Sequence, residues 1–358
     1  MRERAYAEVN LKTLKQNIID IRKTLSKKTK FMAIVKADAY GHGAVEVARA
    51  TLDVGAEYLG VAWVKEARVL RQANINAPIL LLSEPQIETI PVILDLGITP
   101  AVYTEKFARN LSQEASKINK RIKVHIKVDT GMGRIGVQPE ETISLLENIF
   151  GLKNLEVEGL FTHFACADEK DKDYTKKQFS RFQNLICKIE RKGITIPLKH
   201  AANSAATLNF KETHLDLVRI GIAMYKNVLS FKTKVSFIKT VPADFSISYS
   251  RTYKTKEKTN IATLSVGYAD GYSRALSNRG TVIVQRNKYP IVGRICMDMT
   301  IVDIGNNDTI ERGDEVTLIG REEEAQITTL DLAKLTNTIE YEVMCGIGKR
   351  VPRIYIES

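Results

Sequence analysis

Residues 31–62 read FMAIVKADAYGHGAVEVARATLDVGAEYLGVA, and this stretch decides the fold class. An apolar run, Phe31–Lys36, precedes a glycine-containing loop, a stretch with helical spacing over Ala44–Leu52, a stop signal at Gly55 and a second apolar run, Tyr58–Ala62. Short apolar runs predict buried strands, and helical spacing between them predicts a helix that covers the strands. The stretch therefore predicts a βαβ unit with two parallel strands.

The same alternation repeats along the first two thirds of the chain. Each apolar run is followed by a loop and then by a stretch with helical spacing. Eight such units in about 200 residues match the count and spacing of a (β/α)8 barrel of the TIM type. The expected strands are Phe31–Lys36, Tyr58–Ala62, Ile79–Leu82, Thr99–Val102, Lys123–Val128, Glu156–His163, Leu198–Ala201 and Asp216–Arg219.

Beyond about residue 236 the rhythm changes to short alternating strands joined by turn signals. We therefore expect an α/β barrel domain over residues 1–235 and a smaller, mainly β domain over residues 236–358. Ala5–Asn10 also alternates like a strand, so we expect residues 1–9 to join the sheet of the β domain. The strands expected in the second domain are Asn260–Val266, Gly280–Val284, Tyr289–Val292, Met299–Ile304, Glu315–Ile319 and Arg353–Ile356.

Composition limits the classes of partner. The 358 residues include 53 Lys and Arg against 42 Asp and Glu, a formal net charge of +11. Clustered basic residues bind nucleic acids, but those of Tyr174–Arg191 share a helical stretch with acidic and apolar residues, which indicates a solvated face. No stretch approaches the roughly 18 apolar residues of a membrane span, and residues 1–10 lack the apolar core of a signal peptide. We expect a cytoplasmic protein without a nucleic-acid or membrane partner.

Polar residues close several of the expected barrel strands, where a barrel collects its chemistry. Lys36 ends the first strand, and its amine is interpreted either as reaching solvent at the barrel rim or as a Schiff-base lysine. Arg134 follows the fifth strand in a glycine-rich loop that lets it reach across the barrel mouth. His163 ends the sixth strand, where a core histidine is the plainer interpretation. Arg219 ends the eighth.

The loops after the seventh and eighth strands are candidates for binding a phosphate. Barrels often bind phosphate there through backbone N–H groups. Ser204 and the Gly221-Ile222 backbone lie in these loops. Ser204 is explained equally well as a helix cap, so both interpretations stay open.

A set of ordered motifs resembles the alanine racemases, enzymes that depend on pyridoxal 5′-phosphate (PLP) and consist of an α/β barrel and a C-terminal β domain. The resemblance covers nearly the whole chain. One motif alone would occur by chance, but their order and spacing argue against coincidence. The motifs are AIVKADAYGHG (33–43), KVDTGMGR (127–134), THF (162–164), ANSA (202–205), VRIGIAMY (218–225), SY (248–249), GYADG (267–271), GRICMD (293–298) and RVPR (350–353).

This resemblance implies an enzyme that interconverts L-alanine and D-alanine and supplies D-alanine for bacterial cell-wall synthesis. By analogy, Lys36 holds PLP as an aldimine and handles the α-proton of the D-enantiomer, while Tyr249 of the partner subunit handles that of the L-enantiomer. A two-base mechanism of this kind implies a homodimer with shared active sites. No metal is expected.

Other site residues also follow from the resemblance. Arg219 would donate to the pyridine nitrogen of PLP, and His163 would orient Arg219. Arg134 would contact the PLP phenolic oxygen and the substrate carboxylate, with a carbamylated Lys127 as a further hypothesis. The remaining implied residues are Tyr40, Asn203, Ser204, Gly221 and Ile222 for the cofactor, and Tyr268 and Met297 for the substrate.

The sequence departs from the family pattern at two places. Lys349 stands where many members carry a tyrosine, and Ser250-Arg251 replaces a more usual glycine-containing pair. These departures leave open a racemase for another amino acid, such as serine or lysine, on the same scaffold. A PLP-dependent decarboxylase and a single-domain PLP-carrier protein fit less well, because the motifs around Tyr249 and its β domain match racemases.

Overall fold

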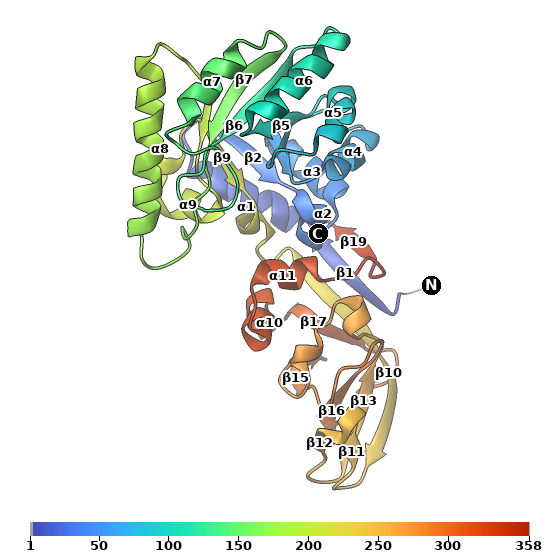
Figure 1. Cartoon of the computed structure of the whole chain (residues 1–358). Helices are drawn as coiled ribbons and strands as arrows, with labels where there is room; N and C mark the ends of the chain where they lie inside the picture. Colours follow the sequence, from blue (N-terminus) through green and yellow to red (C-terminus); the bar gives the residue numbers. More distant parts are fainter. Residues whose placement is uncertain (1–2, 358) are drawn as a thin grey trace. The chain divides into compact units, whose positions relative to one another are not determined.

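The computed structural model describes residues 3–357 as two compact units (Figure 1). The first unit comprises Leu14–Ala39 and Ala44–Met224, and the second comprises residues 3–13, 40–43 and 225–357. The boundary expected between residues 235 and 236 lies inside strand β10, Leu229–Val241, and this strand belongs as a whole to the second unit.

The first unit is built on eight parallel strands, as expected for a (β/α)8 barrel. Its first and last neighbours, β8 and β9, are joined by backbone hydrogen bonds from Asp216 N to Lys199 O (3.1 Å) and from Arg219 N to Ala202 O (3.0 Å). The strands, in spatial order, are β8 (Leu198–His200), β7 (Leu155–Phe161), β6 (Ile122–Lys127), β5 (Thr99–Val102), β4 (Ile79–Leu81), β3 (Tyr58–Val61), β2 (Lys30–Ile34) and β9 (Leu217–Ile220).

Helices follow the barrel strands along the chain (Figure 1). Helix α1 was not predicted from the sequence. Its start is fixed by Asn10, whose side-chain oxygen accepts from Thr13 N at 2.8 Å, as an N-cap does. The helical elements are α1 (Leu11–Lys23), α2 (Lys36–Gly41), α3 (Ala44–Asp53), α4 (Val64–Gln72), η1 (Ile87–Thr89), α5 (Ile90–Leu96), α6 (Glu105–Lys117), α7 (Thr142–Phe150), α8 (Asp173–Arg191), α9 (Ser204–Asn209), η2 (Lys211–Thr213) and η3 (Ile222–Tyr225).

The second unit is mainly β, as expected, with a nine-stranded sheet organised around β10. The β10 strand was not identified from the sequence, although every second residue of its first half, such as Phe231, is buried. Ala5–Asn10 forms β1, which pairs with β10 and β19. The other strands of this sheet are β13 (Thr259–Leu264), β14 (Thr281–Val284), β15 (Asn287–Pro290), β16 (Thr300–Gly305), β17 (Glu315–Glu322), β18 (Ala325–Ile327) and β19 (Arg353–Ile356).

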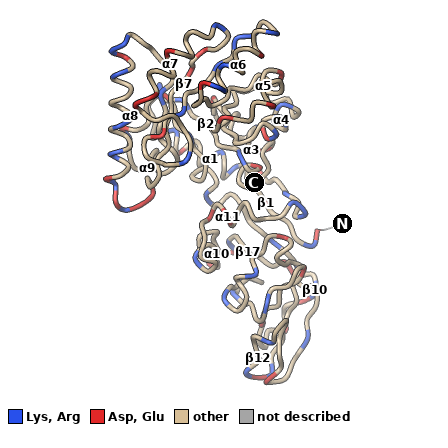
Figure 2. Tube along the Cα trace, in the orientation of Figure 1, with Lys and Arg blue, Asp and Glu red and all other residues tan. Residues whose placement is uncertain are grey.

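Smaller elements complete the second unit. The pair β11 (Ser246–Ile247) and β12 (Tyr253–Lys254) forms a two-stranded sheet, and helices α10 (Thr329–Thr336) and α11 (Glu340–Cys345) follow β18. Basic and acidic residues are interspersed along both units (Figure 2). Within residues 3–357, no helix combines the length and apolarity needed to cross a bilayer.

Candidate active site

Lys36 lies at the carboxyl end of the first barrel strand and is half-buried. The chain then turns in an unusual way, because residues 37–40 all have φ between 52° and 54°. Left-handed backbone costs an L-amino acid roughly 1–2 kcal/mol per residue, so four in succession need support from their surroundings. The strained turn holds Lys36 at the end of β2 instead of letting the strand continue.

Glu66 supplies part of this support. Its Oε1 accepts from Ala37 N at 2.7 Å, and its Oε2 accepts from Ala62 N at 2.8 Å and from Trp63 N at 3.1 Å. One carboxylate therefore ties the residue after Lys36 to the beginning of α4. This link fixes the backbone next to the lysine.

Arg219 is the most enclosed cation of the barrel, with 4% of its surface exposed. One terminal nitrogen contacts His200 Nδ1 at 2.9 Å; the other donates to Thr162 O at 2.7 Å and Ala201 O at 2.9 Å, and lies 3.3 Å from His163 Nδ1. None of these acceptors is a carboxylate. Burial lowers the pKa of Arg219 to about 9, which leaves the guanidinium protonated at neutral pH.

Lys36, Lys127 and Arg134 bring further positive charge to the end of the barrel that holds Arg219. Burial, followed by the charges of Arg219, Arg134 and Lys36, lowers the pKa of Lys127 to about 7. Burial and the same cations, with Lys127, hold the pKa of His163 well below its usual value. The structure therefore brings Lys36, Lys127, Arg134, His163 and Arg219 together. The cations of this group suit an anionic ligand, whereas the lowered pKa leaves His163 neutral.

The loop that carries Arg134 is folded around Asp129. The two carboxylate oxygens accept from the backbone N–H groups of residues 131–134 at 2.8–3.2 Å. Burial opposes ionisation of Asp129, but these four donors outweigh it and lower its pKa. A side chain at Gly136 would approach Asp129 N to 2.7 Å, so the loop requires glycine there.

The candidate phosphate loops meet at Ser204. Its Oγ accepts from Gly221 N at 2.9 Å and from Ala223 N at 3.4 Å. The cap of α9 is Asn203, whose side-chain oxygen accepts from Ala206 N at 3.0 Å. The helix-cap interpretation of Ser204 is therefore wrong, and Ser204 instead joins the loops after β8 and β9.

In the second unit, Tyr249 begins the short helix η4 (Tyr249–Arg251) and is 67% exposed. Its neighbours are strained: Ser248 has φ 59° and ψ −171°, and Ser250 and Arg251 have φ of 60° and 48°. Ser248 Oγ donates to Arg294 O at 2.6 Å, which helps to hold the loop. The departure at Ser250-Arg251 therefore places two side chains where left-handed backbone favours glycine.

Tyr268 and Met297 are also brought together. The turn η5 (Tyr268–Asp270) packs against residues 296–297 through hydrogen bonds from Tyr268 N to Cys296 O and from Ala269 N to Met297 O, both 3.0 Å. A side chain at Gly267 would lie 2.3 Å from Cys296 O. The close approach of the two segments therefore needs glycine at position 267. Tyr268 and Met297 are 42% and 53% exposed.

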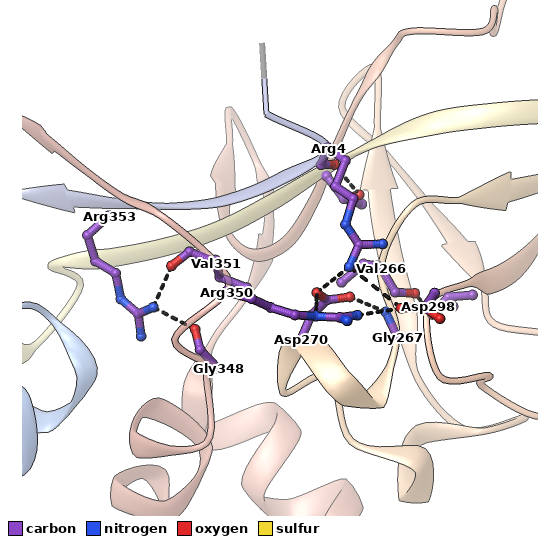
Figure 3. A network of polar contacts seen from close by, with 11 residues as sticks. Arg4, Val266, Gly267, Asp270, Asp298, Gly348, Arg350, Val351 and Arg353 are labelled. Atoms are coloured by element: carbon purple, nitrogen blue, oxygen red, sulfur yellow. Dashed lines mark hydrogen bonds and ion pairs between the residues drawn. The ribbon is translucent and has the colours of Figure 1, made fainter. Parts of the chain in front are cut away.

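A network of arginines and aspartates locks this turn (Figure 3). The side chain of Asp270, 1% exposed, forms 2.7 Å ion pairs with Arg4 and Arg350, and its other oxygen accepts from Gly267 N at 2.9 Å. Arg350 also contacts Asp298 at 2.6 Å. Hydrogen bonds to Asp270 and Asp298 raise the pKa of Arg350. The network links the backbone beside Tyr268 to the residue after Met297.

Tyr40 and Lys349 differ in their surroundings. Tyr40 is buried in the second unit, with its ring edge-on to Tyr225 (4.9 Å) and Tyr341 (5.7 Å), and burial raises its pKa. Lys349 is exposed in a turn closed by a hydrogen bond from Val351 N to Gly348 O at 3.1 Å.

Comparison with known proteins identifies the family. The model of the alanine racemase N-terminal domain matches residues 9–227, and that of the alanine racemase C-terminal domain matches residues 228–355. The chain belongs to the alanine racemase family. A relative from Caldanaerobacter subterraneus subsp. tengcongensis, "Alanine racemase 2", is 43% identical over 98% of this chain and 94% of its own length.

Solved alanine racemases share the fold. The enzyme of Clostridium difficile 630 superposes with a TM-score of 0.95 at 37% identity, covering 100% of this chain and 97% of its own. The alanine racemase of Bartonella henselae, described with covalently bound pyridoxal phosphate, gives 0.89 at 30% identity and covers 99% and 100%. This alanine racemase family is a PLP-dependent group of isomerases, which agrees with the resemblance seen in the sequence.

Three polar residues inside the barrel were not predicted as site candidates: His125, His200 and Glu158. All three are buried, and His200 lies nearer to Arg219 than the expected partner His163 does. A signal was present in the sequence, because each of them is a polar residue inside a run that was expected to form a buried barrel strand.

Proposed function

We propose that the chain is a cytoplasmic, homodimeric alanine racemase that binds PLP and supplies D-alanine for cell-wall synthesis. The observation that carries this proposal is the cation cluster around Arg219, in which a buried guanidinium contacts only neutral acceptors and lies near Lys36, Lys127 and Arg134. The donor set fits PLP, since that cofactor carries a phosphate and a phenolate.

The cofactor-binding roles follow from this fit. Lys36 Nζ would hold the cofactor covalently, Arg219 would donate to the pyridine nitrogen, and the backbone of Gly221 and Ile222 with Ser204 Oγ would bind the phosphate. Asn203 and Tyr40 complete the proposed set. When bound, PLP supplies an electron sink that makes the α-proton of an amino acid removable.

Arg219 has a particular effect on this chemistry. A guanidinium has only donors, so it presents N–H to the pyridine nitrogen and disfavours protonation of that atom. We infer that this arrangement limits side reactions at other carbons. His163, 3.3 Å from Arg219, would help to orient it, and Arg134 would bind the substrate carboxylate.

Two bases are proposed on opposite faces of the substrate carbon. Lys36 Nζ would move the proton of D-alanine, and Tyr249 Oη of the partner subunit that of L-alanine. The 67% exposure of Tyr249 in one protomer supports a role toward another copy of the chain. Tyr268 and Met297 would line the substrate entrance, held by the Asp270 network.

Carbamylation of Lys127 is part of the proposal. With a pKa lowered to about 7, a large fraction of the amine is unprotonated at neutral pH, and this is the form that attacks carbon dioxide. A nitrogen–carbon bond forms, a proton leaves to solvent, and the cation becomes an anion that holds Arg134. Carbamylation adds one carbon dioxide, about 44 Da, to the mass of the protein. An intact-protein mass without this addition would contradict the modification.

The preferred amino acid is tested by relative kcat/KM values for alanine, serine and lysine. The alternative of a serine or lysine racemase rests on Lys349 and Ser250-Arg251, which depart from the family pattern. A kcat/KM for either rival above that for alanine would decide for the alternative.

The decisive experiment uses the purified protein with added PLP. We expect an absorbance band from the bound cofactor, borohydride fixation of the cofactor on Lys36 in a peptide mass map, and conversion of L-alanine to D-alanine. Tyr249→Phe should abolish most racemisation and keep the band, whereas Tyr289→Phe, in the same unit, should change neither. A colourless protein that leaves enantiopure alanine unchanged would contradict the proposal.

A further inference from the structure

A series of hydrogen bonds runs from Arg219 into the barrel interior through His200 and His125 to Glu158. We call these last three residues the relay. Arg219 contacts His200 Nδ1 at 2.9 Å, His200 Nε2 lies 2.9 Å from His125 Nδ1, and His125 Nε2 lies 3.1 Å from Glu158 Oε2. Both histidines are fully buried. At the far end, Lys123 Nζ contacts Glu158 Oε1 at 2.7 Å and is about half exposed to solvent.

The direction of every bond in this chain is determined by its two ends. Arginine can only donate, so His200 Nδ1 must accept, and His200 must carry its proton on Nε2. This proton is donated to His125 Nδ1, which leaves the proton of His125 on Nε2, facing Glu158. Burial, Arg219 and neighbouring cations hold the pKa of His200 well below its usual value, and burial lowers that of His125, so both rings are neutral.

Glu158 is the anion of the chain. Burial opposes its ionisation, but hydrogen bonds from His125 and Lys123 outweigh burial and lower its pKa to about 2. A buried guanidinium without a counter-charge is costly. The relay supplies a counter-charge at a distance and leaves the ligand-facing side of Arg219 without a carboxylate that would repel an anionic cofactor.

The barrel is shaped to admit this relay. A side chain at Gly159, in the strand next to that of His125, would lie 2.4 Å from the His125 ring. Glycine at this position is therefore required for the imidazole to fit. His200 in turn stacks on Phe161 with ring centroids 4.7 Å apart and an interplanar angle of 4°, which fixes the ring that Arg219 contacts.

We propose that His200, His125 and Glu158 are positioning residues that hold Arg219 protonated and oriented toward the cofactor nitrogen. The role of Arg219 toward PLP rests on the proposed function, whereas the relay itself does not. The relay thereby sets how strongly the cofactor withdraws electrons, although none of the three residues is assigned a contact with it.

The first test needs no cofactor. In ¹⁵N-histidine-labelled protein without PLP, NMR should show both His125 and His200 as neutral rings with the proton on Nε2 at pH 7. A charged ring, or a proton on Nδ1 of either residue, would overturn the relay. This result is independent of whether the chain racemises alanine.

The second test compares two variants of one relay residue in the PLP-loaded protein. His200→Gln keeps an acceptor for Arg219 and a donor for His125, whereas His200→Phe keeps only the stacked ring. We expect His200→Phe to shift the ¹⁵N signal of the PLP ring nitrogen toward its protonated value. It should also raise the loss of cofactor by transamination per turnover about 10-fold, the lower end of the effect of removing an outer-shell hydrogen-bond partner at a metal site. His200→Gln should restore most of both.

Glu158→Gln tests the distant charge. It should shift the same nitrogen signal in the same direction, whereas Glu147→Gln, which removes a carboxylate from a surface pair with Lys192, should not. Wild-type signals and transamination ratios in both His200→Phe and Glu158→Gln would show a merely structural role and overturn the proposal. Failure of the wild-type protein to bind PLP would instead contradict the proposed function.

Discussion

The barrel mouth holds a buried arginine and the Asp270 network holds two exposed ones, and the two regions balance the charge in opposite ways. In the network, Arg350 reaches two carboxylates within 2.7 Å, and Arg4 lies 2.7 and 3.8 Å from the same two. In the barrel, the contacts of Arg219 are two carbonyl oxygens and two neutral imidazoles.

This difference distinguishes the charges of the Asp270 network, which stabilise the backbone, from the charges around Arg219, which are suited to bind a ligand. In the Asp270 network, the arginines and aspartates neutralise each other. Their ion pairs stabilise the backbone turn beside Tyr268 and Met297 without a ligand. A cluster of cations with neutral partners has an unfavourable electrostatic free energy, which a bound anion offsets. The proposed function assigns that anion, and four predictions test the contrast.

The largest effect is expected for Lys36→Ala. It should remove the covalent attachment of PLP and lower racemisation by about 10³-fold or more, as the loss of a residue that both anchors and transfers protons does. The measurement is the absorbance of the bound cofactor together with the rate of D-alanine formation. Lys65→Ala, at an exposed lysine of α4, serves as the control. Racemisation within about 10-fold of wild type would remove Lys36 from the mechanism.

The cost of the barrel cations is tested through Lys127 in the cofactor-free, uncarbamylated protein. Its folded-state pKa, about 7, lies below the ordinary value of 10.5, so the folded state binds fewer protons than the unfolded state between these pH values. Lys127 therefore destabilises the fold by on the order of 5 kcal/mol below pH 7, and this penalty disappears as pH rises toward 10.5.

Melting temperatures of wild type and Lys127→Met at pH 6 and pH 9 measure this effect. The variant should be the more stable protein at pH 6, and its advantage should shrink at pH 9. A difference that is the same at both pH values would mean that Lys127 keeps an ordinary pKa.

The network side is tested by Asp270→Asn. The change removes the buried carboxylate that faces two arginines, and because both arginines are 43% exposed, water screens part of the loss. We expect a loss of about 2 kcal/mol in stability and a higher KM for alanine with a smaller change in kcat. Calorimetry and steady-state kinetics check both. Asp308→Asn, at an exposed aspartate of the same unit, should leave both unchanged, and an unaltered melting profile in Asp270→Asn would contradict a stabilising network.

The smallest effect is expected at the strained loop of the second unit. Ser250→Gly removes a side chain from left-handed backbone, and the gain should exceed the entropy cost of glycine by about 0.5 kcal/mol. A chemical denaturation series detects this increase. Ser246→Gly, in β11, should be destabilising, so a loss of stability in both variants would show that the loop is not strained at Ser250.

The fold was largely predictable because its signals are local. Runs such as Ile79–Leu81 are apolar throughout, since both faces of a parallel sheet are covered. The local sequence signals failed to predict β10 and α1. The β10 strand alternates buried Phe231 with half-buried Lys232, and its first half was taken as part of the barrel domain. Asn10 ends β1, as expected, but it also caps α1, and this helix was not predicted.

The sequence by itself determined the eight-strand barrel, the β unit and the family motifs, because periodicity and motif order are written along the chain. Only the tertiary structure decided that Asn203 caps α9 while Ser204 joins two loops, and that Arg219 connects through His200 and His125 to Glu158. The physical reason is that hydrogen-bond direction, burial and shared charge depend on residues far apart in sequence, and closure of the barrel brings those residues into contact.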